Sequence, residues 1–310
     1  MKVIRARVLG FCMGVRRALE LAGAEADRAG GGGVFTLGPL IHNPQALEAL
    51  QNRGVKVIDE NRFPRDMDGA SFIIRAHGIS PQTETELRGR GGRVIDATCP
   101  EVKASQLKAK ALVEAGYRLF LAGEAGHAEL IGIRGYARAG AGAWAEASFC
   151  AVVGNAAEAE EAAAGLSVLS PSSAALRVKT ALIGQTTISE EEYRAIGEGI
   201  KKYFPDLKII QTICAGIRKR QDALRELLGK VDAVIIAGGK KSANTRRLLA
   251  IAEEQGKPCA LVESAAVIPP GFSAFQTVGL CAGASTPDTV VDEIERALST
   301  IEVRNEDNQG

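Results

Sequence analysis

The stretch VIDATCPEV (Val94–Val102) decides how the rest of the chain is interpreted. A short apolar run ends at a cysteine, and a helical pattern begins at once after it. Two other stretches copy this arrangement, VLGFCMGV at residues 8–15 and IIQTICAG at residues 209–216. Apolar runs of this length are typical of buried strands, and the segments that follow have helical periodicity. The sequence therefore predicts a strand that ends in a thiol at the start of a helix, used three times.

The three copies belong to a longer repeat. In each copy a second apolar run is followed by a loop with a polar residue, and His42, His127 and Asn244 stand 30, 28 and 30 residues after their cysteines. Third strands are expected at 55–59, 149–153 and 259–263, and fourth strands end in small polar loops within 73–81, 181–189 and 278–287. Self-similarity at a fixed spacing indicates repeated structural units.

Short strands that alternate with helices are typical of parallel sheets covered by helices on both faces. We therefore expect an α/β protein of three similar units. In such sheets the loops at the carboxyl ends of the strands form the binding crevice. Nine polar loops, three from each unit, can converge if the units pack around a common axis.

The composition excludes several classes of protein. The chain has 310 residues, of which 46% are hydrophobic, enough for two or three domains. A formal net charge of +1 gives no reason to expect nucleic acid or an anionic membrane as a partner. No apolar run is long enough to span a membrane and no signal or transit peptide is recognised, so we expect a cytoplasmic protein. Six cysteines in that compartment argue against a disulfide framework.

The repeat divides the six cysteines into two groups. Cys12, Cys99 and Cys214 occupy equivalent positions, whereas the others lie in apolar runs, where a cysteine usually packs as a small hydrophobic residue: Cys150, Cys259 and Cys281. Helix N-termini stabilise thiolates, and three converging thiolates need a cation or cluster. Structural zinc prefers four ligands, so an iron-sulfur cubane with one open iron fits better. The alternative is that three helix-entry cysteines recur by chance.

All three histidines of the chain fall in the polar loops. As imidazolium groups they would donate hydrogen bonds, and with hydroxyl and amide groups they suit a multiply charged anion such as a diphosphate. The candidate anion-binding residues are His42, His77, His127, Ser242, Asn244 and Ser285.

One carboxylate among these loops is a candidate proton donor. Glu129 stands two residues after His127, and Thr186 or Thr187 could relay the proton. The alternative is a glutamate in the first turn of a helix, which the helix dipole favours.

The motifs resemble those of one enzyme family, the 4-hydroxy-3-methylbut-2-enyl diphosphate reductases of the non-mevalonate isoprenoid pathway. The resemblance covers nearly the full chain, in order. The motifs are GFCMGVRRA at 10–18, GPLIHNP at 38–44, RAHG at 75–78, DATCP at 96–100, QTT at 185–187 and AGAS at 282–285.

The resemblance implies a trefoil of three α/β domains around one [4Fe-4S] cluster per subunit, held by Cys12, Cys99 and Cys214. It also places the first strand with the third domain. The domain boundaries expected on this basis are 14–98, 99–212, 213–298 together with 1–13, and a tail at 299–310.

By the same resemblance, the substrate hydroxyl binds the open iron while its diphosphate is held by the six anion-binding residues, with Thr186 beside it. Glu129 delivers protons, assisted by Thr186 and His127. Two electrons and two protons remove the hydroxyl as water and give isopentenyl or dimethylallyl diphosphate. The electrons would come from ferredoxin or flavodoxin. A possible basic docking surface, which could equally be a solvated helix start, is formed by Lys240, Lys241, Arg246 and Arg247.

The departures from the family pattern that bear most on the site are Ala128, Ile217 and Ala243. The last two each remove a hydroxyl, so weaker or altered substrate binding is expected, with the reaction retained. Two other classes stay open. One is a degenerate iron-sulfur or zinc protein that binds a phosphorylated ligand without reducing it, and the other is a phosphosugar-binding α/β protein with structural cysteines.

Overall fold

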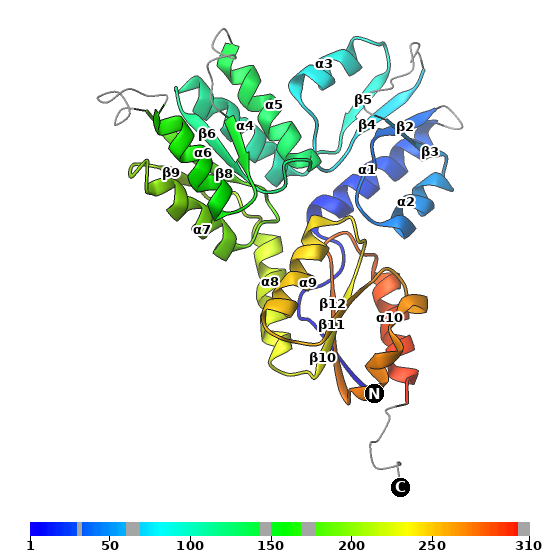
Figure 1. Ribbon diagram of the computed structural model, residues 1–310. Helices are drawn as coiled ribbons and strands as arrows, with labels where there is room; N and C mark the ends of the chain where they lie inside the picture. The colour runs from blue at the N-terminus through cyan, green and yellow to red at the C-terminus, as the bar shows by residue number, and fades with distance from the viewer. Residues whose placement is uncertain (30–32, 60–68, 143–149, 169–177, 303–310) are drawn as a thin grey trace. The chain divides into compact units, whose positions relative to one another are not determined.

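The computed structural model describes residues 1–29, 33–59, 69–142, 150–168 and 178–302 (Figure 1). Its strands form three four-stranded sheets, in which every strand pair is parallel. The chain divides into two compact units. The first unit comprises Met1–Arg16, Ile41–Arg53 and Ala215–Gly310, and the second comprises Arg17–Leu40 and Gly54–Cys214.

The first unit contains one sheet, in the order β1-β12-β10-β11. Its strands are β1 (Lys2–Arg5), β12 (Thr277–Ala282), β10 (Ala233–Ala237) and β11 (Cys259–Val262). Its helices are α2 (Pro44–Gln51), α8 (Ala215–Leu228), α9 (Ala243–Glu254) and α10 (Asp288–Thr300), with short 3-10 turns at Ala265–Val267 and Pro270–Ala274. The N-terminal strand therefore pairs with β12, near the other end of the chain.

Both faces of this sheet are buried. Val234 and Ile236 pack with α8 and α9, whereas Ile235 packs with α10. Successive strand residues point to opposite faces, which explains why an uninterrupted apolar strand can serve two cores. The expectation of helices on both faces is met here.

The second unit contains two sheets, in the orders β3-β2-β4-β5 and β7-β6-β8-β9. The strands of the first of these are β2 (Val34–Leu37), β3 (Val55–Ile58), β4 (Ser71–Ile74) and β5 (Arg93–Asp96). Those of the other are β6 (Arg118–Ala122), β7 (Cys150–Val153), β8 (Thr180–Gly184) and β9 (Lys208–Ile210). The associated helices are α1 (Met13–Ala29), α3 (Pro81–Arg88), α4 (Pro100–Glu114), α5 (Ala128–Ala141), α6 (Ala156–Val168) and α7 (Glu190–Lys201).

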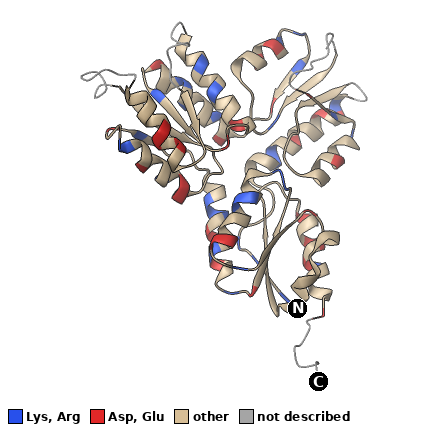
Figure 2. Cartoon of the chain, viewed as in Figure 1, with Lys and Arg blue, Asp and Glu red and all other residues tan. Residues whose placement is uncertain are grey.

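The sheet with β6 and β8 at its centre repeats the two-sided packing. Leu119 and Leu121 pack with α4 and α5, and Phe120 packs with α6 and α7. The inner strands of all three sheets carry hardly any charge, and charged residues lie mostly on helices and loops (Figure 2). The prediction of three α/β repeats, each with one parallel four-stranded sheet, is confirmed. The arrangement of the three repeats around an axis and the exact domain boundaries stay predictions.

One strand prediction is wrong. The apolar residues 8–11 form a loop, and the strand that precedes Cys12 is β1, which ends at Arg5. The chain turns at Gly10, where φ is +76° and an added Cβ would meet Asp288. Val8 and Leu9 are apolar because they pack against the cores beside β12. Apolar character alone cannot distinguish such a packed loop from a strand.

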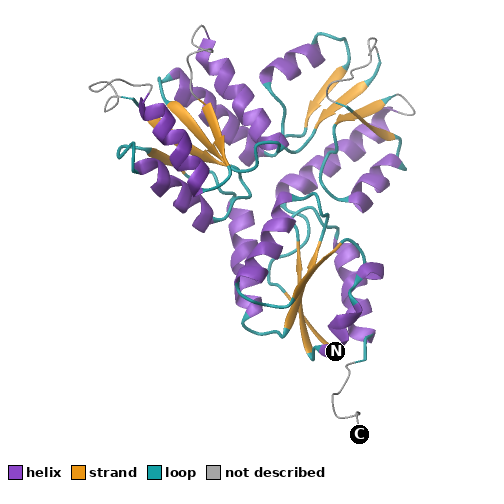
Figure 3. Cartoon of the chain, in the orientation of Figure 1, coloured by secondary structure: helices purple, strands orange, loops and turns teal. Residues whose placement is uncertain are grey.

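The polar loops lie where the sequence places them, between the carboxyl end of a strand and the next helix (Figure 3). Several of these helices begin with a side chain that caps the free backbone N–H groups, as at Asn43, His127 and Ser242. The repeat thus places a cap residue after β2, β6 and β10. Residues 303–310 of the expected tail lie outside the described residues, whereas Ser299 and Thr300 complete α10.

Within the described ranges, no helix combines the length and the apolar character that crossing a membrane would require.

Candidate functional site

The three repeated cysteines all stand at the beginning of a helix. Cys12 immediately precedes α1, Cys99 is the N-cap residue of α4, and Cys214 immediately precedes α8. Each is half-buried, and no cysteine of the chain, all of which fall in described segments, forms a disulfide. The backbone N–H of Val15 donates to Cys12 Sγ at 3.4 Å. All three cysteines therefore stand at the start of a helix, where the backbone N–H groups face an anionic ligand.

The other three cysteines behave as the sequence predicts. Cys150 and Cys259 begin strands β7 and β11 and pack against apolar cores, and Cys281 is fully buried in β12. Burial raises the pKa of the Cys150 thiol to about 11 and that of the Cys281 thiol to about 12. Burial also raises the pKa of Cys259. A raised pKa disfavours the thiolate that metal binding requires.

The donor set fits an iron-sulfur cluster with three protein ligands. It consists of three thiols at helix N-termini, and the competing cysteines are held protonated in the cores. Thiolates are the usual ligands of such clusters. Cys12 belongs to the first unit, and Cys99 and Cys214 belong to the second.

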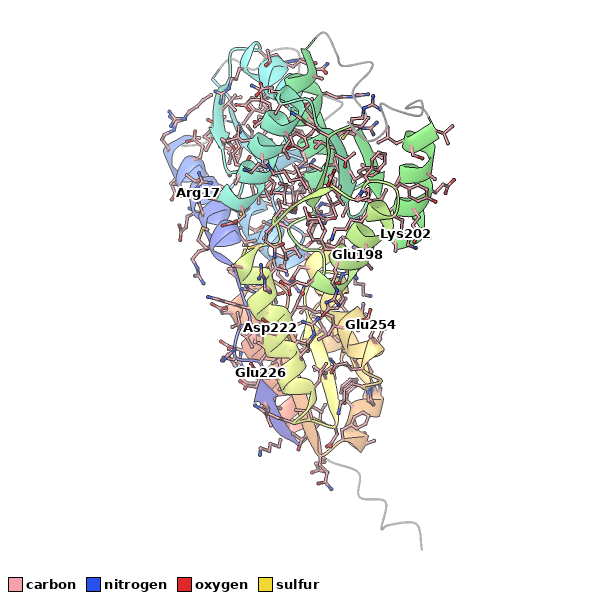
Figure 4. The ribbon with its side chains drawn as sticks, turned by 90° about the vertical axis from the view of Figure 1, so that its left-hand side faces the viewer. Arg17, Glu198, Lys202, Asp222, Glu226 and Glu254 are labelled. Atoms are coloured by element: carbon pink, nitrogen blue, oxygen red, sulfur yellow. The ribbon has the colours of Figure 1, made fainter. Side chains whose placement is uncertain are left out.

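Arg17 fixes the loop that carries Cys99. This residue lies on α1 (Figure 4), and its guanidinium donates to the carbonyls of Asp96 and Thr98, at 3.2 Å each. The Asp96 carboxylate in turn accepts from the Thr98 N–H at 2.9 Å. The short connection between β5 and α4 is thus held from both sides. Nothing in the sequence pattern pointed to this role of Arg17.

Arg220 has a similar role in the first unit. It lies on α8, is nearly fully buried, and donates to the carbonyl of Gly10 at 2.7 Å and to that of Gly216 at 3.0 Å. Gly10 lies two residues before Cys12. Each compact unit therefore has an arginine, on a helix that follows a cysteine, that anchors the loop before a different cysteine.

Arg17→Ala is expected to lower the free energy of unfolding by about 2 kcal/mol, because two hydrogen bonds from a charged donor are lost and two carbonyls lose their partner. Urea denaturation measures this change. Arg16→Ala is the matched control, since Arg16 is exposed and stands beside it on α1. Equal effects of the two substitutions would show that Arg17 does not hold the loop.

Glu129 is buried and paired with Thr186. Its side chain is 2% exposed on α5, Oε1 accepts from the Thr186 N–H at 2.7 Å, and Oε2 accepts from the Thr186 hydroxyl at 2.9 Å. Burial raises the pKa of the carboxyl group to about 7, while the bonds from Thr186 act in the opposite direction. A carboxyl group with a pKa near neutrality can donate a proton at physiological pH.

Of the two candidate relays, Thr186 contacts Glu129. The hydroxyl of Thr187 instead accepts from Gln185 Nε2 at 3.0 Å, and Gln185 Oε1 accepts from the backbone N–H of Glu124 at 3.1 Å. The bond between Glu124 and Gln185 therefore joins the loop after β6 to the loop after β8. The structure brings Glu129 and Thr186 together as expected, and their catalytic roles stay predictions.

His127 and His77 lie against each other in the second unit. Their rings meet edge to face, with centroids 5.3 Å apart. His127 Nδ1 accepts from the Glu129 N–H at 3.2 Å, because His127 caps α5. An accepting nitrogen carries no proton, so only Nε2 of His127 can carry an N–H. The sequence-based expectation of two donors from an imidazolium is wrong for this residue.

The burial of Glu129 predicts a pH-dependent stability. Between pH 4.5 and about 7 the unfolded carboxyl group is ionised while the folded one keeps its proton, so stability falls as pH rises. The shift corresponds to about 3 kcal/mol, complete above pH 7. Glu129→Gln removes this dependence. Urea denaturation of both proteins at several pH values measures the difference in their free energies of unfolding. This difference should narrow, or reverse in favour of the glutamine variant, as pH rises. A difference that does not change with pH would contradict the raised pKa.

The remaining candidate residues lie in the first unit. Ser285 Oγ donates to the carbonyl of His42 at 3.3 Å, and Ser242 Oγ accepts from the Thr245 N–H at 3.3 Å as the cap of α9. Asn244 is 4% exposed, and neither of its side-chain polar atoms has a hydrogen-bond partner among the described residues. A buried amide without partners is costly, which indicates that Asn244 is prepared for a polar ligand.

The residues that depart from the family pattern are all placed at helix starts. Ala128 is the first residue of α5, and Ile217 and Ala243 are buried in the first turns of α8 and α9. Of the basic residues, Lys240, Lys241 and Arg246 are exposed, and Arg246 donates to the carbonyl of Lys240. This bond shapes the helix start, and nothing in it favours a docking surface over a solvated helix end.

Comparison with known proteins gives a consistent result. The family model described as LytB protein matches residues 3–299. A 4-hydroxy-3-methylbut-2-enyl diphosphate reductase of Treponema denticola is 45% identical over 302 residues, which cover 96% of this chain and 99% of the relative. The reductase of that name from Aquifex aeolicus is 37% identical over 300 residues, covering 96% of each chain.

Solved structures agree. One solved structure is described as (E)-4-hydroxy-3-methyl-but-2-enyl diphosphate reductase, the terminal enzyme of the non-mevalonate pathway. It is 37% identical to this chain, with a TM-score of 0.67. The match covers 97% of this chain and 100% of the solved chain. The E-1-hydroxy-2-methyl-but-2-enyl-4-diphosphate reductase from Plasmodium falciparum is 24% identical with a TM-score of 0.84, and it supports the fold alone. The resemblance inferred from the motifs is confirmed, and this chain belongs to the LytB protein family.

Proposed function

We propose that the chain is a reductase that converts 4-hydroxy-3-methylbut-2-enyl diphosphate to isopentenyl diphosphate and dimethylallyl diphosphate, in the last step of the non-mevalonate pathway. The names of its relatives support this assignment. The observation that carries it is Glu129, a buried carboxyl group with a pKa of about 7 that is hydrogen-bonded to Thr186. Such a group is suited to supply protons to a reductive dehydroxylation.

A [4Fe-4S] cluster, one per subunit, would be held by Cys12, Cys99 and Cys214. When bound, the cluster supplies electrons and an open iron that acts as a Lewis acid toward the substrate hydroxyl. Arg17 and Arg220 fix the loops before Cys99 and Cys12, so that these sulfurs are presented at defined positions. Ligands positioned by surrounding hydrogen bonds are the usual arrangement around metal sites.

The diphosphate would be bound by the candidate residues that can donate hydrogen bonds. The donors are imidazole N–H groups, hydroxyl groups and one amide, from His42, His77, His127, Thr186, Ser242, Asn244 and Ser285. Because the Asn244 amide is buried without a partner among the described residues, it gains a hydrogen bond on binding without first losing one to them. The hydroxyl of Ser242 can donate while its oxygen remains the cap of α9.

Glu129 would hold the proton, and Thr186 would orient the Glu129 carboxyl group. Both carboxylate oxygens accept bonds from Thr186, one from the backbone and one from the hydroxyl, so the position of the carboxyl group is fixed. His127 lies two residues before Glu129, caps the same helix through Nδ1, and would bind the substrate through Nε2. The reaction consumes two electrons and two protons and releases the hydroxyl as water.

The electrons would come from outside the chain, since its loops have no nucleotide-binding fingerprint, and the family resemblance implies ferredoxin or flavodoxin as the donor. A cytoplasmic location and the domain boundaries 14–98, 99–212 and 213–298 with 1–13 belong to the same proposal. No membrane or nucleic acid takes part in the reaction as we propose it.

The test is anaerobic purification with iron and sulfide analysis, followed by addition of the substrate diphosphate and dithionite-reduced viologen. About four irons and four sulfides per chain, with oxidation of the dye, are expected. Cluster without turnover would favour the degenerate binding protein. A chain that takes up no iron after reconstitution would favour the phosphosugar-binding alternative.

A further inference from the structure

Gln106 is a buried amide that the proposed reaction does not use. It lies on α4, seven residues and thus two helical turns after Cys99. Its side chain is 1% exposed, and neither Nε2 nor Oε1 has a hydrogen-bond partner among the described residues. Buried amides are nearly always hydrogen-bonded, to protein or to ordered water.

The amide lies at the junction of three segments. An added Cβ at Gly78, where φ is +72°, would come within 2.3 Å of Gln106 Nε2, and one at Gly132 would come within 2.8 Å. The two glycines therefore leave the space that the amide fills. Gly78 follows His77, and Gly132 lies on α5, one turn after Glu129.

These three segments carry the candidate groups of the second unit: Cys99 precedes α4, His77 lies in the loop after β4, and His127 and Glu129 begin α5. The Gln106 amide, from α4, lies beside Gly78 of the loop after β4 and beside Gly132 of α5. The carbonyl of Ile79 lies near the same point, 3.6 Å from the position of a Cβ on Gly132. A small polar molecule at this junction would find a donor and an acceptor on the amide and a carbonyl close by.

We propose that Gln106 is a positioning residue that binds one ordered water molecule and, with it, fixes the loop of His77 against α5. The consequence is the edge-to-face contact of the His77 and His127 rings. A buried water needs two to four polar partners, and the two polar atoms of the amide and the carbonyl of Ile79 can provide them. The effect on catalysis rests on the proposed reductase function, whereas the effect on the histidine pair does not.

Two substitutions test the proposal. Gln106→Leu removes both polar atoms at similar size, and Gly132→Ala leaves Gln106 in place but pushes its amide away. Gly132 lies in a helix, where alanine is intrinsically favourable, so that variant is expected to fold. The matched controls are Gln221→Leu and Gly165→Ala. Gln221 is equally buried, seven residues after Cys214 and in the first unit, and an added Cβ at Gly165 meets nothing within 4 Å.

The first readout is the NMR spectrum of the three histidine rings, assigned with single His→Asn variants. Both test variants are expected to shift the ring signals of His77 and His127 and to leave those of His42 in place, while both controls leave all three unchanged. A wild-type crystal structure should contain a water hydrogen-bonded to the Gln106 amide. Unchanged His77 and His127 signals in both test variants, or a dry amide, would overturn the proposal.

The second readout separates positioning from stability. With the reductase assay, Gln106→Leu and Gly132→Ala are expected to raise KM for the diphosphate about tenfold with a smaller change in kcat, because the histidine pair is misplaced before chemistry begins. A lower melting temperature with unchanged KM and unchanged ring signals would assign Gln106 a structural role only. If the wild-type protein does not turn over, the reductase proposal fails while the ring signals still decide the role of Gln106.

Discussion

Glu129→Gln is expected to lower kcat by about 10²- to 10⁴-fold, the range typical for loss of a general acid, while the cluster is retained. Glutamine keeps the size of the side chain and an oxygen that can accept from Thr186, but it has no acidic proton. Steady-state oxidation of reduced viologen measures the loss. Iron analysis of the same preparation should match the wild type, because Glu129 is not among the proposed ligands.

The matched control for this substitution is Glu124→Gln. Glu124 is exposed and lies in the loop before α5, five residues earlier. Its carboxylate has no part in the proposed reaction, so the activity should stay near that of the wild type. Full activity of the Glu129→Gln variant would remove Glu129 from the mechanism, and the raised pKa would then be a consequence of burial alone.

Cys99→Ser is expected to abolish stable cluster binding. A serine hydroxyl is a poor ligand for iron, because it ionises far less readily than a thiol, and the remaining two thiolates cannot hold a cubane that requires three protein ligands. Iron and sulfide analysis after anaerobic reconstitution, together with the visible absorption of the cluster, measures the outcome. Reductase activity should disappear with the iron.

Cys150→Ser provides the comparison for the same atomic change. Cys150 is a half-buried residue at the start of β7 whose pKa is raised to about 11, so it is held as a thiol. This variant should keep the full complement of iron and most of the activity. If the two variants lose iron equally, the sorting of cysteines by their place in the repeat is wrong.

Most of the fold could be predicted because the repeat appears in the local sequence pattern of apolar runs and polar loops. Apolar runs such as Ala233–Ala237 are buried on both faces, and polar loops follow them at a constant spacing. Residues 8–11 form a loop although their apolar run predicts a strand, because side chains that pack on a core from a loop are as apolar as those of a strand. The pairing of β1 with β12 could not be derived from the repeat, since it joins residues from opposite ends of the chain.

The candidate site was predictable only in its residue types. The spacing of His127 and Glu129 at a helix start suggested a proton donor, yet a glutamate in a first turn is usually exposed and ionised. Its 2% exposure, and the resulting pKa of about 7, depend on α5 packing against the loop after β8. The choice of Thr186 over Thr187 likewise depends on which hydroxyl that packing turns toward the carboxylate.

The sequence by itself determined the three α/β units, the loops that carry the polar residues, and the division of the cysteines, because these follow from periodicity and from position in a repeat. Only the tertiary structure decided that Arg17 and Arg220 hold the cysteine loops, that His127 has one N–H to donate, and that Gln106 lies between Gly78 and Gly132. The physical reason is that hydrogen-bond partners and desolvation depend on segments far apart in the chain, whereas helix and strand patterns are local.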